Sequence, residues 1–273
     1  MPFSKLNLSK PVLQGVKAMG WTDPTPIQLR AIPLLLEGKD VIGSAQTGTG
    51  KTGAFALPML SILGKKHGKT RVLILEPTRE LASQVETAIR DYARFTDLTV
   101  AVIYGGVGYG KQVDALKNGV DIIVATPGRL LDHMQQGVAK LGDISHVVLD
   151  EADRMLDMGF IHDVERIIAK LPRERRTGFF SATLPAAVQA LAKRLLVDPV
   201  RITINPEQPT VEKICQRLLY VDRDKKDDLL VSILRDPEVG RAIVFTQMKY
   251  KANRVCERLE RVGISAAPIH GNK

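Results

Sequence analysis

The sequence predicts an α/β protein in which a parallel sheet lies between helices. Short apolar runs rich in β-branched residues alternate with longer amphipathic stretches, which is typical of parallel strands that helices cover on both faces. With 273 residues, 44% of them hydrophobic, the chain has room for one complete domain and part of a second. The expected strands are 41–44, 72–75, 100–104, 121–125, 146–149, 177–180 and 200–204, and the expected helices include 28–36, 79–95 and 186–195.

A domain boundary is expected where this alternation stops. The polar, proline-containing stretch NPEQPTVEK begins at Asn205 and interrupts the pattern. We therefore expect a first domain over 1–205, a linker over 206–212 and the beginning of a second α/β domain over 213–273. In the second domain we expect strands near 214–221, 242–246 and 264–269, and helices near 224–234 and 252–262.

Composition and charge narrow the class of protein. The net charge of +9 is compatible with a polyanionic partner such as nucleic acid, although charge alone is a weak indicator. No stretch approaches the roughly 20 apolar residues of a membrane span, and the start of the chain lacks the apolar core of a signal peptide. We therefore expect a cytoplasmic protein without a membrane partner.

The segment AQTGTGKT at 45–52 predicts a phosphate-binding loop. It follows an expected strand and opens a helix, as a P-loop requires, although Ala45 stands where the pattern has glycine. Glycines let backbone N–H groups approach phosphate oxygens, Lys51 adds a positive charge, and the Thr52 hydroxyl can bind Mg²⁺. The alternative is a glycine-rich turn without a ligand. The residues expected around the nucleotide are Ala45, Gln46, Thr47, Gly48, Thr49, Gly50, Lys51 and Thr52.

The segment VVLDEAD supplies the acidic half of the same site. Its apolar part predicts a buried strand that ends at Leu149, and α/β sheets bind ligands at the carboxyl ends of their strands. Asp150 is expected to hold Mg²⁺, usually through water, and Glu151 to orient or deprotonate the attacking water. The alternative is a pair of acids that merely favours a helix N-terminus.

The segment GWTDPTPIQ ends at Gln28, whose amide offers one acceptor and one donor. This pair matches the N6 amino group and N7 of adenine, whereas guanine presents two acceptors there. The segment therefore predicts ATP rather than GTP as the nucleotide. The alternative is a helix that starts at PTP and leaves Gln28 exposed.

Together, these segments resemble the DEAD-box RNA helicases over the whole chain. GWTDPTPIQ, AQTGTGKT, PTRELA, the pair Gly105 and Gly106, TPGR, DEAD and SAT occur in the order and spacing of that family. The resemblance implies a RecA-like fold, ATP and Mg²⁺ as cofactors, and RNA as the partner. It also implies that Phe3, 17 residues before Gly20, stacks on adenine and that Trp21 borders the nucleotide site.

The resemblance further implies an RNA groove linked to the ATP site. Arginines and threonines can bind phosphate oxygens, so contacts to the RNA backbone without sequence preference are expected, although the threonines could instead cap helices. Ser181 and Thr183 are expected to hydrogen-bond the region of Asp153 and so couple the ATP state to RNA binding. The expected RNA-binding residues are Pro77, Thr78, Arg79, Gly105, Gly106, Thr126, Pro127 and Arg129.

Two residues depart from the family pattern. Trp21 stands where Phe or Tyr is commoner, and Glu76 precedes PTRELA where a small or apolar residue is usual. Neither is expected to take part in the reaction directly.

The second domain resembles the start of the family's second RecA-like lobe, through AIVFTQMK at 242–249 and IHG at 269–271. The family's arginine-rich motif would follow Lys273, and arginine fingers contribute about 10³ to 10⁵ in rate. The chain as given is therefore expected to bind ATP and RNA weakly and to hydrolyse ATP poorly.

The implied function is that of a monomeric ATP-dependent RNA helicase, whose RNA-stimulated ATP hydrolysis drives local duplex unwinding or remodelling of RNA–protein particles. One alternative is a non-catalytic module that binds nucleotide and RNA. Another is a DNA-acting helicase or a different P-loop ATPase.

Overall fold

The computed structural model describes residues 2–204, 215 and 217–271. The chain forms two compact units, Met1–Gln208 and Pro209–Lys273, and each is described by itself. The linker predicted at 206–212 lies outside the described residues.

The first unit is built on a seven-stranded parallel sheet, which confirms the predicted fold class. The strands follow the order β3-β4-β2-β5-β6-β1-β7. Three strands have the predicted bounds, and the other four differ by one residue at one or both ends. The strands are β1 (Val41–Ser44), β2 (Val72–Leu75), β3 (Val100–Ile103), β4 (Ile122–Ala125), β5 (His146–Leu149), β6 (Arg176–Ser181) and β7 (Val200–Thr203).

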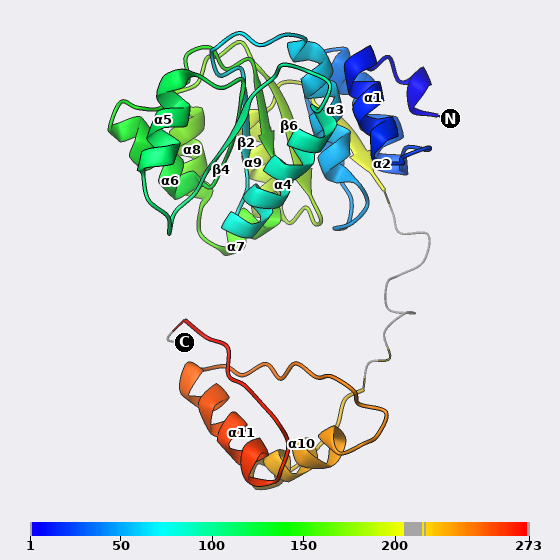
Figure 1. Ribbon diagram of the computed structural model, residues 1–273, viewed down its shortest axis with the longest axis vertical. Helices are drawn as coiled ribbons and strands as arrows, with labels where there is room; N and C mark the ends of the chain where they lie inside the picture. The colour runs from blue at the N-terminus through cyan, green and yellow to red at the C-terminus, as the bar shows by residue number, and fades with distance from the viewer. Residues whose placement is uncertain (1, 205–214, 216, 272–273) are drawn as a thin grey trace. The chain divides into compact units, whose positions relative to one another are not determined.

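Helices cover both faces of this sheet (Figure 1). One apolar core lies between the sheet and the first four α-helices, and a second core lies on the opposite face, under the next five. None of the helices in the described part of the chain is long and apolar enough to cross a membrane. The helices are η1 (Phe3–Lys5), α1 (Lys10–Ala18), α2 (Pro26–Leu36), α3 (Lys51–Leu63), α4 (Arg79–Tyr92), α5 (Gly110–Asn118), α6 (Pro127–Gln135), α7 (Ala152–Asp157), α8 (Ile161–Ile168) and α9 (Ala186–Leu195).

The strand order sorts the sequence motifs into two groups along one edge of the sheet. All strands are parallel, so their carboxyl ends lie at the same edge, and the motif loops follow these ends. The neighbours β5, β6 and β1 are followed by DEAD, SAT and AQTGTGKT. The neighbours β3, β4 and β2 are followed by the glycine pair, TPGR and PTRELA. The two groups meet where β2 pairs with β5.

The second unit contains helices but no strand among its described residues. Both predicted helices form, as α10 (Lys226–Leu234) and α11 (Lys249–Arg261), with the short η3 (Arg223–Lys225) before them. The strands predicted at 242–246 and 264–269, and in the described part of 214–221, are wrong for this structure.

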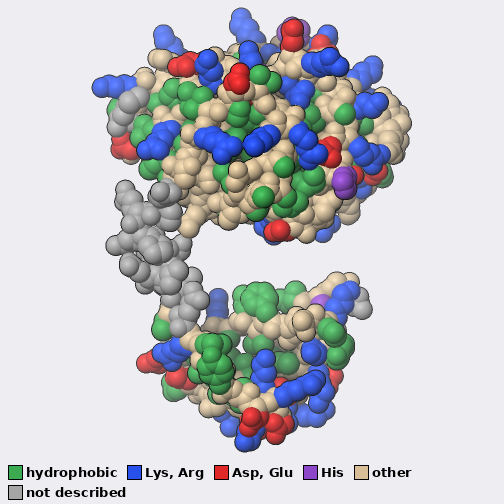
Figure 2. All heavy atoms as spheres, turned by 180° about the vertical axis from the view of Figure 1, so that it is seen from behind, with side chains coloured by type: hydrophobic (Ala, Val, Ile, Leu, Met, Phe, Trp, Pro, Cys, Tyr) green, Lys and Arg blue, Asp and Glu red, His purple; other side chains and the backbone are tan. Residues whose placement is uncertain are grey.

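The physical reason lies in what a parallel strand needs. Such strands are stable when neighbours complete their hydrogen bonds and helices cover both faces. Here most apolar side chains of the predicted strands, including Tyr220, Phe245 and Ile269, are exposed, and Figure 2 shows hydrophobic side chains on the surface of this unit.

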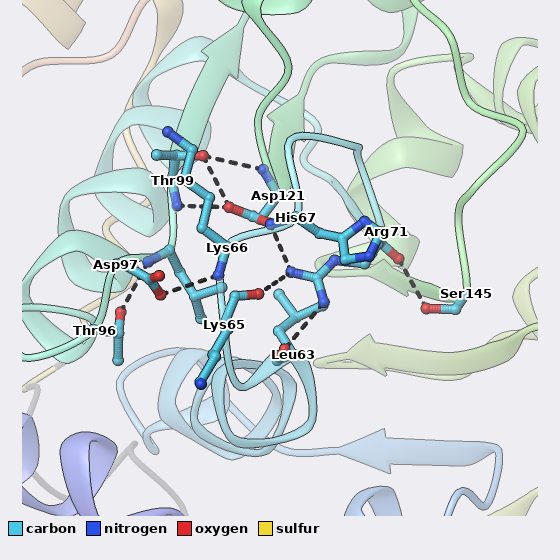
Figure 3. Close-up of polar contacts among 11 residues, drawn as sticks. Leu63, Lys65, Lys66, His67, Arg71, Thr96, Asp97, Thr99, Asp121 and Ser145 are labelled. Carbon is cyan, nitrogen blue, oxygen red and sulfur yellow. Dashed lines mark hydrogen bonds and ion pairs between the residues drawn. The ribbon is translucent and has the colours of Figure 1, made fainter.

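At the other edge of the sheet, where the strands begin, a polar cluster surrounds Asp121, just before β4. Its buried carboxylate accepts hydrogen bonds from Arg71 Nη2 at 2.6 Å and from the backbone N–H groups of His67 and Thr99, each at 3.0 Å (Figure 3). Burial alone would raise the pKa of Asp121, but the hydrogen bonds from Arg71, Thr99 and His67 outweigh it and hold the pKa below its usual value. The cluster links the loop after α3 to the residues just before β2 and β4 through hydrogen bonds.

Replacing Asp121 by alanine is expected to lower the free energy of unfolding of the first unit by about 3 to 5 kcal/mol, because Arg71 loses its buried partner. The matched control is Asp143→Ala, which breaks an exposed ion pair with Lys69 and should cost at most about 1 kcal/mol. Urea denaturation of both variants measures the difference, and equal losses would contradict a structural role for the cluster.

The same residue predicts a dependence of stability on pH. Because the folded-state pKa of Asp121 is lowered, its contribution is fully present above the unfolded-state pKa of about 3.9. That contribution is lost as the pH falls through the folded-state pKa.

Candidate active site

The loop at 45–52 leads from β1 into α3, so α3 begins at the edge of the sheet where the strands have their carboxyl ends. Gly48 and Gly50 have φ angles of +83° and +91°, a backbone conformation that other residues rarely adopt. The first N–H groups of a helix have no partner within the helix, and they attract anions together with the helix dipole. The loop thus has a backbone geometry that suits a phosphate group.

Lys51, the first residue of α3, pairs with the acidic motif. Its Nζ lies 2.8 Å from Glu151 Oε1, and its side chain is only 5% exposed. The Thr47 hydroxyl approaches the same oxygen at 3.5 Å. The structure therefore brings the predicted phosphate-binding cation and the predicted base into direct contact.

Asp150 lies directly beside this pair, 5% exposed. Its backbone N–H donates to Leu75 O at 3.1 Å and continues the sheet, while its Oδ1 accepts from the Glu151 N–H at 2.9 Å. Burial raises the pKa of Asp150 to about 7; the positive charge of Lys51 opposes this shift, and the negative charge of Glu151 adds to it.

Glu151 has a strained backbone. Its φ angle is +51°, in the left-handed region that residues other than glycine seldom occupy. Such strain persists where the surrounding structure enforces it, and it is concentrated at functional sites. The conformation turns the chain sharply between β5 and α7.

The donor set of the site suits Mg²⁺. Thr52 offers a hydroxyl from the first turn of α3 and Asp150 a carboxylate, both of them the oxygen ligands that Mg²⁺ prefers. In the described part of the chain, no three acidic, histidine or cysteine side chains are arranged to hold a metal by themselves. Mg²⁺ usually binds through one or two carboxylates, water and substrate phosphates, so these residues fit a metal that arrives with a nucleotide.

Gln28 joins the segment GWTDPTPIQ to the phosphate loop. Its Nε2 donates to Gly50 O at 3.1 Å, and its Oε1 accepts from the Thr25 N–H at 3.0 Å. The side chain is 2% exposed, so the alternative of an exposed Gln28 is wrong. Counting donors and acceptors leaves one N–H and one lone pair for adenine.

Phe3 does not present an open ring face. It is 4% exposed, and its ring stacks on Trp21 with 6.2 Å between the centroids. Trp21 in turn contacts Tyr92 of α4 at 5.5 Å between ring centroids. Phe3 belongs to the apolar core on this face of the sheet, and Trp21 packs against that core. Stacking of Phe3 on adenine would require its ring to become exposed.

Replacing Gly50 by alanine is expected to lower the free energy of unfolding by about 1 to 3 kcal/mol. A Cβ at this position would lie 2.7 Å from Gln28 Nε2 and 2.9 Å from Thr25 Oγ1. Gly48→Ala is the matched control, because its φ angle is similar but a Cβ there would meet nothing within 4 Å. Thermal unfolding compares the two variants; if Gly48→Ala were as destabilised as Gly50→Ala, the packing of Gln28 on the loop would not be the cause.

The SAT motif contacts the DEAD motif as predicted. Asp153 Oδ2 accepts from the Thr183 N–H at 2.8 Å and from the Thr183 hydroxyl at 2.7 Å, while the Asp153 N–H donates to Ser181 Oγ at 3.1 Å. Burial would raise the pKa of Asp153, but the hydrogen bonds from Thr183 and Ser181 outweigh it and keep the pKa below its usual value. The contacts are confirmed, whereas their role in coupling stays a prediction.

The predicted RNA-binding residues gather at the neighbouring ends of β3, β4 and β2. Arg79 is exposed and lies against Gly106, where a Cβ would be 2.1 Å from its Nη1. Thr78 caps α4 by accepting from the Leu81 N–H at 3.3 Å, so its alternative role as a cap is confirmed. Three of the predicted residues, Pro77, Thr126 and Pro127, are buried.

Tyr109 is a residue of this edge that the sequence analysis missed. The Arg129 guanidinium lies 4.1 Å above the centre of its ring, and Arg129 Nη1 donates to Val107 O at 3.1 Å. The loop after β3 therefore positions the arginine of TPGR. The signal available in the sequence was a tyrosine three residues after the glycine pair.

Glu76, which the sequence analysis noted only as a departure from the family pattern, is buried at the end of β2 beside the acidic motif. It is 0% exposed, and neither of its carboxyl oxygens has a hydrogen-bond partner among the residues that the structure describes. Burial raises the pKa of Glu76 well above its usual value; the charges of Asp150 and Glu151 raise it further, and Lys51 opposes them. Glu76 thus lies within electrostatic reach of all three residues of the acidic site.

Comparison with known proteins agrees with this arrangement. The chain is 42% identical to the ATP-dependent RNA helicase DeaD of Escherichia coli strain K12 over 99% of its length, and 41% identical to the DEAD-box ATP-dependent RNA helicase CshA of Bacillus subtilis, also over 99%. It spans 43% and 55% of those relatives, so it corresponds to about half of each. 

A solved structure is also similar. The crystal structure of a DEAD box protein from the hyperthermophile Methanococcus jannaschii aligns with all of this chain and with 74% of its own chain, at a TM-score of 0.73 and 36% sequence identity. This match confirms the RecA-like fold. The family model described as DEAD/DEAH box helicase matches residues 25–191, more than half of the chain. By this match, the chain belongs to the DEAD/DEAH box helicase family.

Proposed function

We propose that this chain is the ATP-binding part of an ATP-dependent RNA helicase, in which RNA-stimulated hydrolysis is coupled to local duplex unwinding or remodelling of RNA–protein particles. The observation that carries the proposal is the ion pair between Lys51 and Glu151 at the start of α3, with Asp150 beside it. The names of DeaD and CshA, both ATP-dependent RNA helicases, support it.

In this proposal, Lys51 exchanges Glu151 for phosphate oxygens when ATP binds. Lys51 is the first residue of α3, and the N–H groups at the N-terminus of a helix attract anions. The exchange leaves the Glu151 carboxylate able to accept a proton from the water that attacks the γ-phosphate. Thr52 and Asp150 would hold Mg²⁺, which when bound neutralises charge on the phosphate oxygens.

RNA is proposed to bind along the ends of β3, β4 and β2. Arg79 and Arg129 can pair with phosphates, and Gly106, which has no Cβ, lets the Arg79 guanidinium lie against the loop after β3. Contacts of this kind are independent of sequence. We propose that the protein works as a monomer in the cytoplasm.

Coupling between the two sites is proposed to pass through the SAT motif. The Thr183 hydroxyl donates a hydrogen bond to Asp153, which lies two residues after Glu151. A movement of the acidic motif would therefore displace Thr183, which follows β6. A Thr183→Val variant would keep the shape of the side chain and lose the hydroxyl.

The test is phosphate release from ATP by the full-length protein, with and without single-stranded RNA at fixed salt, because phosphate contacts vary steeply with salt. RNA is expected to raise the rate, and single-stranded DNA to raise it less. A rate that RNA leaves unchanged would contradict the helicase assignment. Equal stimulation by DNA would favour a DNA-acting enzyme, and ATP binding without any hydrolysis would favour a non-catalytic module.

A further inference from the structure

Glu76 lies at the junction between the two groups of motifs. It directly follows β2, and its backbone N–H donates to Ala125 O of β4 at 2.9 Å. On the other side of β2, Ile74 pairs with Val148 and Leu75 with Leu149, so the register brings Glu76 next to Asp150. The residue thus stands between the acidic motif and the end of β4, which TPGR follows.

Glu76 and Asp150 share the face of the sheet that α3 covers. Side chains alternate between the two faces of a strand, and Ile74 and Val148, two positions earlier, both belong to the core beneath α1 to α4. Lys51 begins α3 on that same face. The carboxyl of Glu76 is therefore directed toward the space between the start of α3 and Asp150.

A carboxyl group in this position needs a partner. Glu76 is fully buried, and both of its oxygens lack a hydrogen bond among the described residues. An unsatisfied buried polar group costs about 1 to 3 kcal/mol, and a charged one costs more. Because such groups are rare in folded proteins, each calls for an explanation such as a water or an ion at the site.

The balance of charge indicates the kind of partner. Three buried acidic residues, Glu76, Asp150 and Glu151, interact electrostatically with one buried cation, Lys51, and Lys51 bonds to Glu151. The proposed function moves Lys51 toward phosphate and so leaves the acids with even less positive charge. A hydrated Mg²⁺ supplies both charge and hydrogen-bond donors, since it usually keeps several of its waters when it binds to protein.

We propose that Glu76 is a third acidic residue of the metal–nucleotide site, a positioning residue that accepts hydrogen bonds from water bound to Mg²⁺. The inference rests on the proposed ATP function. It adds to that function an outer partner for the metal that the sequence pattern does not contain.

The experiment measures the affinity of the chain for ADP by calorimetry, once with excess Mg²⁺ and once with a chelator. The ratio of the two affinities is the metal-dependent gain, and it does not depend on hydrolysis. Complete loss of an outer partner of a metal site lowers metal affinity by about tenfold or more. Glu76→Gln keeps one acceptor oxygen and lacks the carboxylate, so its gain is expected to fall by up to that amount. The affinity for metal-free ADP should stay that of the unchanged protein.

Two further variants keep the test decisive. Glu76→Leu removes the hydrogen-bonding oxygens while filling the same buried space, so its gain should fall at least as far as that of Glu76→Gln. Glu174→Gln is the matched control, because this exposed residue precedes β6 at the opposite edge of the sheet, and its gain should not change. Circular dichroism establishes that each variant is folded.

The outcomes separate the inference from the function on which it rests. If the unchanged chain binds ADP with a metal-dependent gain, and both Glu76 variants keep that gain, Glu76 is a buried structural acid and the inference is overturned. If the unchanged chain binds no ADP at all, the proposed function itself fails.

Discussion

Replacing Glu151 by glutamine is expected to lower the rate of ATP hydrolysis by about 10² to 10⁴, the usual contribution of a positioned general base. Glutamine has the same shape as glutamate but cannot accept a proton at neutral pH. Affinity for ATP should be retained or increased, because Lys51 no longer has to leave a carboxylate 2.8 Å away. Phosphate release by the full-length protein, with RNA present, measures the rate.

Glu37→Gln is the matched control for this prediction. Glu37 is exposed at the end of α2, at the edge of the sheet opposite the active site, so its loss should leave the rate unchanged. A Glu151→Gln variant that hydrolyses ATP at the normal rate would show that another group accepts the proton.

Replacing Lys51 by alanine is expected to weaken ATP binding by about 2 to 5 kcal/mol, the range for truncating a buried, hydrogen-bonded charge. This corresponds to a loss of affinity of about thirtyfold to several thousandfold. Lys51 is the buried cation at the start of α3, and its removal also leaves Glu151 without its partner. A fluorescent ATP analogue and titration calorimetry both measure the loss of affinity.

The control for Lys51 is Lys69→Ala. Lys69 pairs with Asp143 on the surface, where both side chains are about half exposed, so its removal should leave ATP binding unchanged. If Lys51→Ala bound ATP as tightly as the unchanged chain, the phosphates would have to lie elsewhere than at the start of α3.

The strands of the first unit could be predicted because each is a short, continuous apolar run. β2 and β5 are flanked by polar or turn-forming residues, and their bounds follow directly from the sequence. The order of the strands could not be predicted in the same way, because pairing of β2 with β5 joins residues more than 70 positions apart. In the second unit the same apolar signal failed, since a run of β-branched residues does not supply the neighbours that a strand requires.

The positions of the site residues were predictable where motif and element agree, as for Lys51 at the start of α3 and Glu151 after β5. The sequence could not show that these two side chains form an ion pair with each other. It also could not show that the Gln28 amide already forms hydrogen bonds with Gly50 O and the Thr25 N–H. Phe3 was expected to stack on adenine; in this structure its ring is buried and stacks on Trp21, because aromatic rings gain free energy from burial. Glu76 was noticed as an unusual residue, yet its importance depends on the register between β2 and β5.

The most direct test of the central claim is a crystal structure of this chain with ADP and Mg²⁺. We expect the β-phosphate among the N–H groups of the loop at 45–52 and Lys51 Nζ on a phosphate oxygen, no longer 2.8 Å from Glu151 Oε1. A nucleotide bound elsewhere, or bound in the loop with the ion pair between Lys51 and Glu151 intact, would contradict the account.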